Sequence, residues 1–331
     1  RWPHYAGWLY DFVRSGRLEA IMPIIDALHA LNAATRECWL DLAADIGADD
    51  LLAHTGYLHV YSEDASFAKG AWERGLMQER HVRFDVLDAN ELRALEPGIG
   101  AGFRHAVFQR DALAMRDPGG FCVALAGALQ SRGLRSLQGR VSAIAPADDG
   151  YVLKTDAGDV HAGKVVIAGG VWSNALLAPF GLRIPVIPAR GYHLMYPSPE
   201  TPVVGRPTLW AERYMVVSPM RGDIRMTSNK ELTAPGTLPR CGLTHRLDGE
   251  ARKLFPALVS PPASEWAGLR PCTPDSLPVI DRVGDEDVWI AAGHGHLGLT
   301  QAPITARLIA ESIDGAPTTL PLAPYSIARF R

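Results

Sequence analysis

The sequence predicts an α/β protein with two domains. The first observation is a pattern that occurs twice, at 164–173 and 288–313: a short apolar run, then glycines, then helical spacing. An apolar run bounded by charge and glycine predicts a buried strand. The second observation is length, because 331 residues can bury a large core and normally form two domains.

The glycine-rich turns favour a nucleotide site. Gly293, Gly295 and Gly298 lie between an apolar run and a helical pattern, where bare backbone N–H groups at a helix N-terminus stabilise negative charge. A tight turn that merely requires positive φ would explain these glycines equally well. The second turn, at Gly169 and Gly170, makes a nucleotide site the better reading of the pair.

Composition narrows the class of protein. Hydrophobic residues make up 47% and charged residues 21% of the chain, which is ordinary for a globular protein. A formal net charge of −3 gives no electrostatic argument for binding nucleic acid. The chain shows no apolar run of transmembrane length and no signal peptide. We therefore expect a cytoplasmic protein, and leave peripheral contact with the inner face of a membrane open.

Cysteine usage fits a reducing compartment. The four cysteines are far apart and form no Cys-x-x-Cys pair, so neither a disulfide framework nor a zinc site is expected. They are Cys38, Cys122, Cys241 and Cys272.

The first third of the chain is mostly helical in pattern. Apolar spacing over 18–46 predicts one long helix or two abutting ones that end at Gly47, with Pro23 marking a first turn or a break. Residues 55–61 alternate and are rich in β-formers, which predicts a strand. Residues 65–79 have helical spacing.

Turn and cap signals place the next elements. Asp88 and Glu91 have the spacing of a capping box, which predicts a short helix ended by a Pro-Gly pair. A helix is expected over 119–132, a strand over 136–144, and a hairpin with its turn near Gly158.

A second hairpin is expected over 210–227, with its turn at Arg221 and Gly222.

Two motifs near the C-terminus resemble a known family. Gly-Leu-Arg-Pro-x-Thr-Pro-Asp at 268–275 precedes Ala-Gly-His-Gly-His-x-Gly-Leu-Thr-x-Ala-Pro at 292–303. Together they resemble the C-terminal signature of FAD-dependent amine and D-amino-acid oxidoreductases. Segment 164–172 also resembles the family's Val-Val-x-Ala-x-Gly-x-Trp. The likeness extends over nearly the whole chain and looks nearest to bacterial D-amino-acid dehydrogenase.

The resemblance implies how the domains are assembled. A Rossmann-like FAD-binding domain would comprise 1–48, 112–176 and 266–331, and a mixed α+β substrate domain with an antiparallel sheet would comprise 49–111 and 177–265.

The family opens with a strand and Gly-x-Gly-x-x-Gly that hold the FAD pyrophosphate, and this sequence does not open with such a unit. On this reading the chain lacks its first β-α-β unit and would bind FAD poorly by itself.

The resemblance also implies which residues contact FAD. Val141 would present its backbone to the adenine, and the two glycine turns would lie against the dinucleotide. His294 and His296 could suggest a metal pair, but no third ligand has suitable spacing, so no metal is expected. The implied FAD-binding residues are Val141, Gly169, Gly170, Trp172, Gly293, His294, Gly295, His296, Leu297, Gly298, Leu299 and Thr300.

Arg270 is the candidate for substrate binding. An arginine offers a two-pronged fork to a carboxylate, although it could instead pair with a nearby acid such as Asp275, which we read as a turn residue. In the family this arginine clamps the amino-acid carboxylate, and a tyrosine corresponding to Tyr214 lies near the substrate. Residues 227–231 depart from the family's Gly-Thr-x-Glu, which leaves the substrate open.

The implied reaction transfers a hydride from the Cα of a D-amino acid to flavin, giving an imine that water hydrolyses, as in amino-acid catabolism. The electron acceptor would be oxygen, a quinone or an electron-transfer protein. A secondary-amine oxidase acting on glycine, sarcosine or a D-proline derivative is the alternative. A flavin-free inactive fragment or non-catalytic subunit is the alternative from another class.

Overall fold

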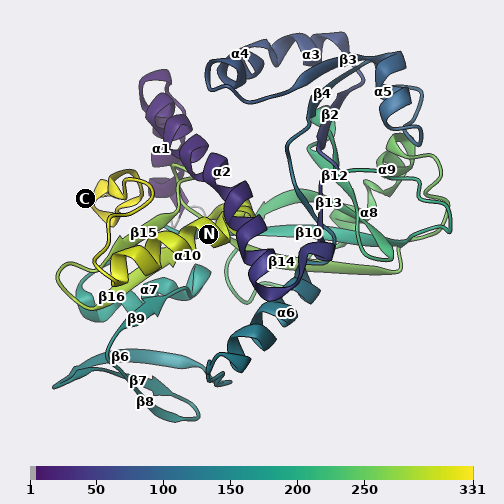
Figure 1. The fold of residues 1–331 in the computed structure, drawn as a ribbon. Helices are drawn as coiled ribbons and strands as arrows, with labels where there is room; N and C mark the ends of the chain where they lie inside the picture. The colour runs from purple at the N-terminus through teal and green to yellow at the C-terminus, as the bar shows by residue number, and fades with distance from the viewer. Residues whose placement is uncertain (1–4, 331) are drawn as a thin grey trace.

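The structure, a computed structural model, describes residues 5–330. Its largest element is an eight-stranded sheet in the order β14-β10-β13-β12-β11-β2-β4-β3 (Figure 1). Neighbouring strands are antiparallel except β11 and β2, which are parallel. Its strands are β2 (Tyr57–Tyr61), β3 (Asp85–Asp88), β4 (His105–Gln109), β10 (Ile187–Pro197), β11 (Thr208–Trp210), β12 (Met215–Pro219), β13 (Asp223–Leu232) and β14 (Ser264–Cys272).

Three smaller sheets complete the β-structure. One has the order β15-β16-β9, in which β16 runs antiparallel to β15 and parallel to β9. A second is the antiparallel meander β6-β7-β8, and β1 pairs with β5. Their strands are β1 (Leu52–Ala53), β5 (Ala114–Met115), β6 (Val141–Ala147), β7 (Gly150–Thr155), β8 (Gly158–Ala162), β9 (Val165–Ile167), β15 (Val279–Arg282) and β16 (Val288–Ala292).

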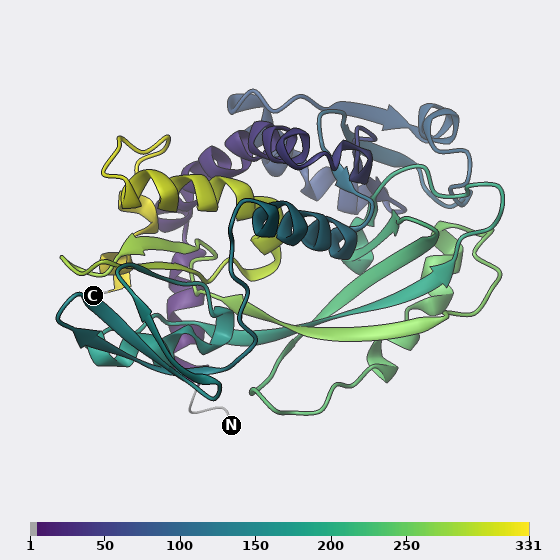
Figure 2. The same cartoon turned by 60° about the horizontal axis from the view of Figure 1, so that its bottom comes forward.

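The two longest helices, α2 and α10, lie next to each other. The 29-residue α2 packs beside α10, and the two helices cover the small β15-β16-β9 sheet (Figure 2). None of the helices within residues 5–330 is long and apolar enough to cross a membrane. The α-helices are α1 (Ala6–Ser15), α2 (Leu18–Ile46), α3 (Asp64–Lys69), α4 (Ala71–Glu79), α5 (Ala89–Leu95), α6 (Pro118–Ser131), α7 (Ser173–Leu177), α8 (Gly242–His245), α9 (Asp248–Leu254) and α10 (Gly298–Ile313).

Short 3-10 turns connect several of these elements. They are η2 (Asp49–Leu51), η3 (Gly170–Trp172), η4 (Ala178–Phe180), η5 (Ala211–Arg213), η6 (Gly295–Leu297), η7 (Ala323–Tyr325) and η8 (Ile327–Phe330).

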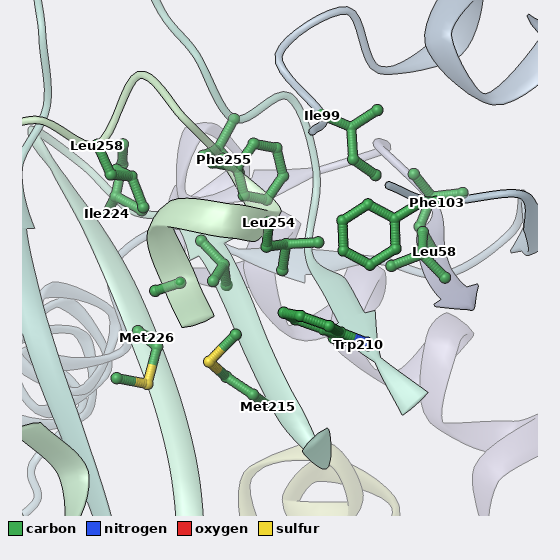
Figure 3. Packing of buried hydrophobic residues seen from close by; sticks show 14 of the residues in the cluster. Leu58, Ile99, Phe103, Trp210, Met215, Ile224, Met226, Leu254, Phe255 and Leu258 are labelled. Carbon is green, nitrogen blue, oxygen red and sulfur yellow. The ribbon is translucent and has the colours of Figure 1, made fainter. Parts of the chain in front are cut away.

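The largest hydrophobic core covers one face of the eight-stranded sheet. Side chains alternate along a strand, so Ile224 and Met226 of β13 share a face and are buried against Leu254 and Phe255 of the α9 segment (Figure 3). Burying an aliphatic side chain of this size contributes about 1.5–3 kcal/mol to folding. This core leaves the opposite face of the sheet free to carry other side chains.

Several sequence predictions are confirmed. Asp88 accepts bonds from the backbone of α5 while Glu91 closes the capping box. Gly158 begins β8 directly after the β7–β8 turn, and Gly222, with φ 84°, lies in the β12–β13 turn.

Other predictions need correction. Pro23 lies inside one continuous α2, beyond its first turn, because a helix this well packed tolerates one missing N–H. Helical structure over 65–79 is split at Gly70, and the strand expected over 136–144 begins at Val141. Apolar spacing predicts the last helix over 302–313, but the helix starts four residues earlier, at Gly298.

Candidate active site

Two glycine turns lie side by side because the strands before them are neighbours. Strands β9 and β16 are parallel, with Val165 opposite Val288 and Ile167 opposite Ile290. Their carboxyl ends therefore meet at one edge of the small sheet, followed by η3 and η6. Ligands of open α/β sheets bind beyond the carboxyl ends of the strands.

The backbone of these turns explains most of their glycines. The backbone φ angles of Gly170, Gly293 and Gly295 are 57°, 80° and 55°. Residues other than glycine rarely adopt such positive values. Gly298 is different, because its φ of −55° is helical. The alternative explanation, a turn that requires positive φ, therefore does not apply to Gly298, and a reason for glycine there must come from space rather than conformation.

The N-terminus of α10 offers backbone N–H groups that no side chain caps. Leu297 gives this helix no side-chain cap, and a helix N-terminus leaves backbone N–H groups free to meet a ligand. Within residues 5–330, three buried side-chain oxygens lack a hydrogen-bond partner, and two of them follow the turns: Ser173 Oγ after the first and Gln301 Oε1 after the second. The third is Glu212 Oε2, in η5. Positive-φ glycines, free N–H groups and the two oxygens after the turns fit an extended, negatively charged dinucleotide such as FAD.

The two histidines of the second turn have different environments. His294 Nε2 lies 2.9 Å from Thr305 Oγ1, so its ring is turned into α10 and only its backbone can face a ligand. Partial desolvation, and then the charges of Lys230 and Arg270, lower the pKa of His296. His296 therefore lies near Arg270, as an uncharged imidazole around neutral pH. No cluster of metal-binding side chains occurs among the residues described.

Acid should destabilise the protein through His294. Burial lowers the pKa of His294 to about 4, against about 6.5 in an unfolded chain. Below about pH 6.5 the unfolded state binds the proton first, so the contribution is fully present above that pH and is lost toward pH 4. From pH 7 to 5 we expect a loss on the order of 1–2 kcal/mol in unfolding free energy.

Urea unfolding at both pH values measures this loss. His294→Gln should show a smaller decrease between them, whereas His59, whose burial also lowers its pKa to about 4, contributes equally to both proteins. An unchanged decrease in His294→Gln would contradict the assignment to His294.

Strand β14 joins the large sheet to the two glycine turns. It pairs along its length with β10, and its last residue, Cys272, forms an isolated bridge with His294. Both η3 and η6 pack against this strand. Arg270, two residues before that end, is therefore held at the junction of the sheet and the turns.

The guanidinium of Arg270 lies over Gly191 of the neighbouring strand. Gly191 of β10 is directly opposite Gly268 of β14, and a Cβ built on Gly191 would collide with the Arg270 guanidinium. Only glycine leaves room for a flat group to lie on the strand in this way. The sequence therefore places a glycine where the guanidinium needs one.

Arg270 has the environment of an anion-binding residue. It is half-buried, desolvation lowers its pKa, and its side chain makes no hydrogen bond or ion pair with any of residues 5–330. Asp275 instead pairs with Arg329 at 2.7 Å and accepts from the Leu277 backbone, which confirms Asp275 as a turn residue. Pairing of Arg270 with Asp275 is thereby excluded. A partly desolvated guanidinium strongly favours a charged, two-oxygen partner such as a carboxylate.

Gly191→Ala should displace the guanidinium without removing it. The colliding atoms are the tip of a flexible side chain, so the strand should fold and Arg270 should shift. We expect KM for a carboxylate substrate to rise about tenfold, since misplacing one charge-assisted contact costs roughly 1–2 kcal/mol. Steady-state kinetics with flavin content as control checks this. An unchanged KM would contradict the position assigned to Arg270.

Tyr214 lies farther from the turns than Arg270. It ends η5 with φ 47°, its side chain is 84% exposed, and its carbonyl accepts from Ser228 Oγ at 3.4 Å. Ser228 is opposite Tyr192, the neighbour of Gly191, so β13 separates Tyr214 from the glycine pair. Its ring makes no hydrogen bond or ring contact with the residues described.

The other expected residues are distributed around the turns. Val141 begins β6 and is half-buried at the margin of the cluster that includes Val165 and Ile167. Trp172 is 59% exposed at the end of η3. Leu297, Leu299 and Thr300 lie in η6 and the first turn of α10, and the Thr300 carbonyl accepts from Thr35 and Trp39.

The sheet face that carries Arg270 also carries residues that sequence reasoning missed. We call it the site face: Arg270, Gly268 and Trp266 of β14, with His193 and Arg225 on the adjoining strands. Desolvation lowers the pKa of Arg225. The available signal was the alternation of Arg225 with the buried Ile224 and Met226, which places it opposite the core.

The two glycine turns that could hold a dinucleotide thus lie beside an arginine whose side chain has no partner within residues 5–330. The sequence comparisons give the class: residues 3–312 match the family described as FAD dependent oxidoreductase. The chain belongs to this family, and its cofactor is FAD.

Curated relatives cover most of the chain. The D-amino-acid oxidase of Bradyrhizobium diazoefficiens is 30% identical over 100% of this chain and 80% of that protein. A D-amino acid dehydrogenase of Cereibacter sphaeroides is 31% identical over 89% of this chain and 69% of its own length. The glycine oxidase of Pseudomonas aeruginosa is 32% identical over 75% and 69%. The chain is similar to amino-acid oxidases and to dehydrogenases alike.

Solved structures confirm the fold. Glycine oxidase from Geobacillus kaustophilus has a TM-score of 0.84 at 23% identity, over 92% of this chain and 83% of that one. L-proline dehydrogenase from P. horikoshii has a TM-score of 0.80 at 22% identity, over 91% and 82%.

Proposed function

We propose that the protein oxidises the Cα–N bond of a D-amino acid to an imine, with the substrate carboxylate bound by Arg270. The observation that carries this proposal is the half-buried guanidinium of Arg270, which has no partner within residues 5–330 and lies beside the two glycine turns. The D-amino-acid oxidase and dehydrogenase among the relatives support the substrate class.

The chain's own residues would hold and orient the reactants. The turns at 169–172 and 293–300, with the backbone of Val141, would bind FAD through close backbone approach and free N–H groups. Bound FAD supplies a two-electron acceptor for the hydride leaving the substrate Cα. Arg270 would fix the carboxylate and so restrict how Cα is presented. Tyr214 would lean over the site from η5.

The substrate amino group either loses its proton to solvent or is already uncharged when the substrate binds. His296, uncharged near neutral pH, would not repel it. Loss of the hydride leaves an imine, and water converts it to a 2-oxo acid and ammonia. No side-chain base is needed for this sequence.

We also propose the division into domains. An FAD-binding domain of 1–48, 112–176 and 266–331 would contain the small sheet and α10, and a substrate domain of 49–111 and 177–265 would contain most of the large sheet. Strand β14 crosses the boundary at residue 266, which suits a strand that presents Arg270 to both parts.

The cellular setting follows from the same proposal. Amino-acid oxidation in the cytoplasm, with peripheral contact at the inner face of a membrane, would bring the enzyme near an oxygen, quinone or protein electron acceptor.

A secondary-amine substrate is the second candidate. The similarity to glycine oxidase supports it, together with the departure from the family pattern at 227–231 on β13. The two candidates differ in the amine that must be accommodated, not in the role of Arg270.

A substrate panel tests the proposal. Dye reduction and hydrogen peroxide formation should be measured with D-amino acids, their L-enantiomers, glycine, sarcosine and D-proline, and the 2-oxo acid identified. We expect D-amino acids to react and their L-enantiomers to react at least tenfold more slowly. Preference for glycine or sarcosine would favour the second candidate, and no reaction with any amino acid would contradict the proposal.

A further inference from the structure

Trp266 and Arg270 converge on one spot of the site face. A Cβ built on Gly268 would collide with the indole of Trp266, just as one built on Gly191 would collide with the Arg270 guanidinium. Gly191 and Gly268 are directly opposite each other. Cβ positions of such a pair lie about 5 Å apart on the same face of a sheet. The indole and the guanidinium are therefore neighbours above a glycine floor.

The indole is accessible and held in place. Trp266 is 58% exposed, which is unusual for a tryptophan that is part of a large sheet. Its ring stacks on His193, with centroids 5.2 Å apart and 20° between the ring planes. Burial and the charge of Arg225 lower the pKa of His193, so the imidazole behind the indole is uncharged near neutral pH. One face of the stack is thus fixed by protein, which leaves an open aromatic surface.

The spacing of the two groups matches an amino acid. In an amino acid, one carbon joins the carboxylate to the side chain, so a carboxylate on Arg270 brings the first side-chain atoms toward the neighbouring indole. An indole gains most from apolar and aromatic surface, by burial and by stacking. A small side chain such as a methyl would leave most of that surface uncovered.

We propose that Trp266 is a specificity-determining residue that receives the side chain of the substrate and selects amino acids with aromatic or large apolar side chains. This inference rests on the proposed amino-acid oxidase or dehydrogenase function and on the anchoring of the carboxylate at Arg270. It adds the substrate class that the site prefers.

A purely structural role for Trp266 would have different consequences. An aromatic ring laid over a strand glycine can simply protect that glycine. In that case removing the ring would lower stability and would affect all substrates alike. The distinguishing quantity is therefore the ratio of kcat/KM for a large substrate to that for a small one.

The experiment compares D-phenylalanine with D-alanine in Trp266→Leu, Trp266→Phe and the unaltered protein. We expect kcat/KM for D-phenylalanine to fall about 10- to 100-fold in Trp266→Leu, mainly through KM, and that for D-alanine by no more than about threefold. Trp266→Phe should keep most of the ratio. Trp72, 54% exposed on α4, gives the matched control, because Trp72→Leu removes an exposed indole away from the site face.

The opposite results are equally clear. A uniform loss for both substrates, or an unchanged ratio in Trp266→Leu, would overturn the inference. A preference for D-glutamate that Trp266→Leu leaves intact would overturn it in favour of Arg225 as the side-chain partner. If Trp266→Leu does not fold, Trp266→Phe decides. Because phenylalanine still offers a stacking surface, loss of the preference for D-phenylalanine over D-alanine in Trp266→Phe would contradict the inference. Failure of every amino acid to react with the unaltered protein would instead overturn the proposed function itself.

Discussion

Arg270→Ala should lower kcat/KM for an amino-acid substrate about 100- to 1000-fold while FAD stays bound. The guanidinium is half-buried and has no partner among the described residues, so a bound carboxylate would be its charge partner. Removing a charge-assisted pair from a largely desolvated site costs on the order of 3–4 kcal/mol, which corresponds to about two to three powers of ten in rate. Arg270→Lys keeps the charge but loses the fork, so it should recover only part of the loss.

Flavin content and thermal stability separate this effect from damage to the fold. Arg329→Ala is the contrasting variant, because Arg329 binds Asp275 and the Leu277 carbonyl at the far end of the same turn. It should lower the melting temperature and change KM little. Loss of flavin and stability in Arg270→Ala, with normal saturation by substrate in the remaining holoenzyme, would contradict the assignment of Arg270 to substrate binding.

Gly298→Val should weaken FAD binding about 10- to 100-fold with little change in the stability of the apoprotein. Gly298 has a helical φ, and the nearest protein atom to a Cβ built there is His294 Cβ at 3.6 Å, an ordinary contact. Valine is no worse than glycine in a helix. A loss of FAD affinity would then show that the valine side chain crowds the bound cofactor. Overpacking of this kind typically costs about 1–3 kcal/mol.

Gly127→Val is the matched control, since Gly127 is also helical, in α6, and has open space where its Cβ would be. FAD dissociation constants of the two variants and of the unaltered protein should be measured by fluorescence titration. Equal affinity in Gly298→Val would show that the N-terminus of α10 does not face the flavin. The glycines with positive φ make poorer tests, because a substitution there strains the backbone whether or not FAD is bound.

Local signals in the sequence placed most of the elements that surround the site. The apolar runs before Gly169 and Gly293 predicted the strands β9 and β16, and the capping and turn residues predicted α5 and both hairpins. Such signals involve residues close in sequence, where propensity and periodicity act directly. The same reasoning misplaced the start of α10, because Gly298 and its neighbours have turn-like composition and the helix there is set by tertiary packing.

The geometry of the site face was not accessible in this way. The position of the Arg270 guanidinium depends on the absence of a side chain at Gly191, 79 positions earlier in the sequence. The two residues come together only through the pairing of β10 with β14. Arg225 and Trp266 look like ordinary strand residues until the register shows which face they share. The alternative that Arg270 pairs with Asp275 is likewise excluded only in the structure, where Asp275 pairs with Arg329. No sequence motif surrounds Arg329. Register and long-range ion pairs are properties of the folded chain, so local patterns do not contain them.

The most direct test of the account is anaerobic titration of the yellow holoenzyme with a D-amino acid and with the amine that lacks only its carboxylate. Carboxylate anchoring at Arg270 predicts that the D-amino acid bleaches the flavin absorbance at low concentration and yields its 2-oxo acid. The matching amine should require at least about 100-fold higher concentration. Equal bleaching by both compounds would contradict a carboxylate-anchored site, and no bleaching by any amino acid would contradict amino-acid oxidation altogether.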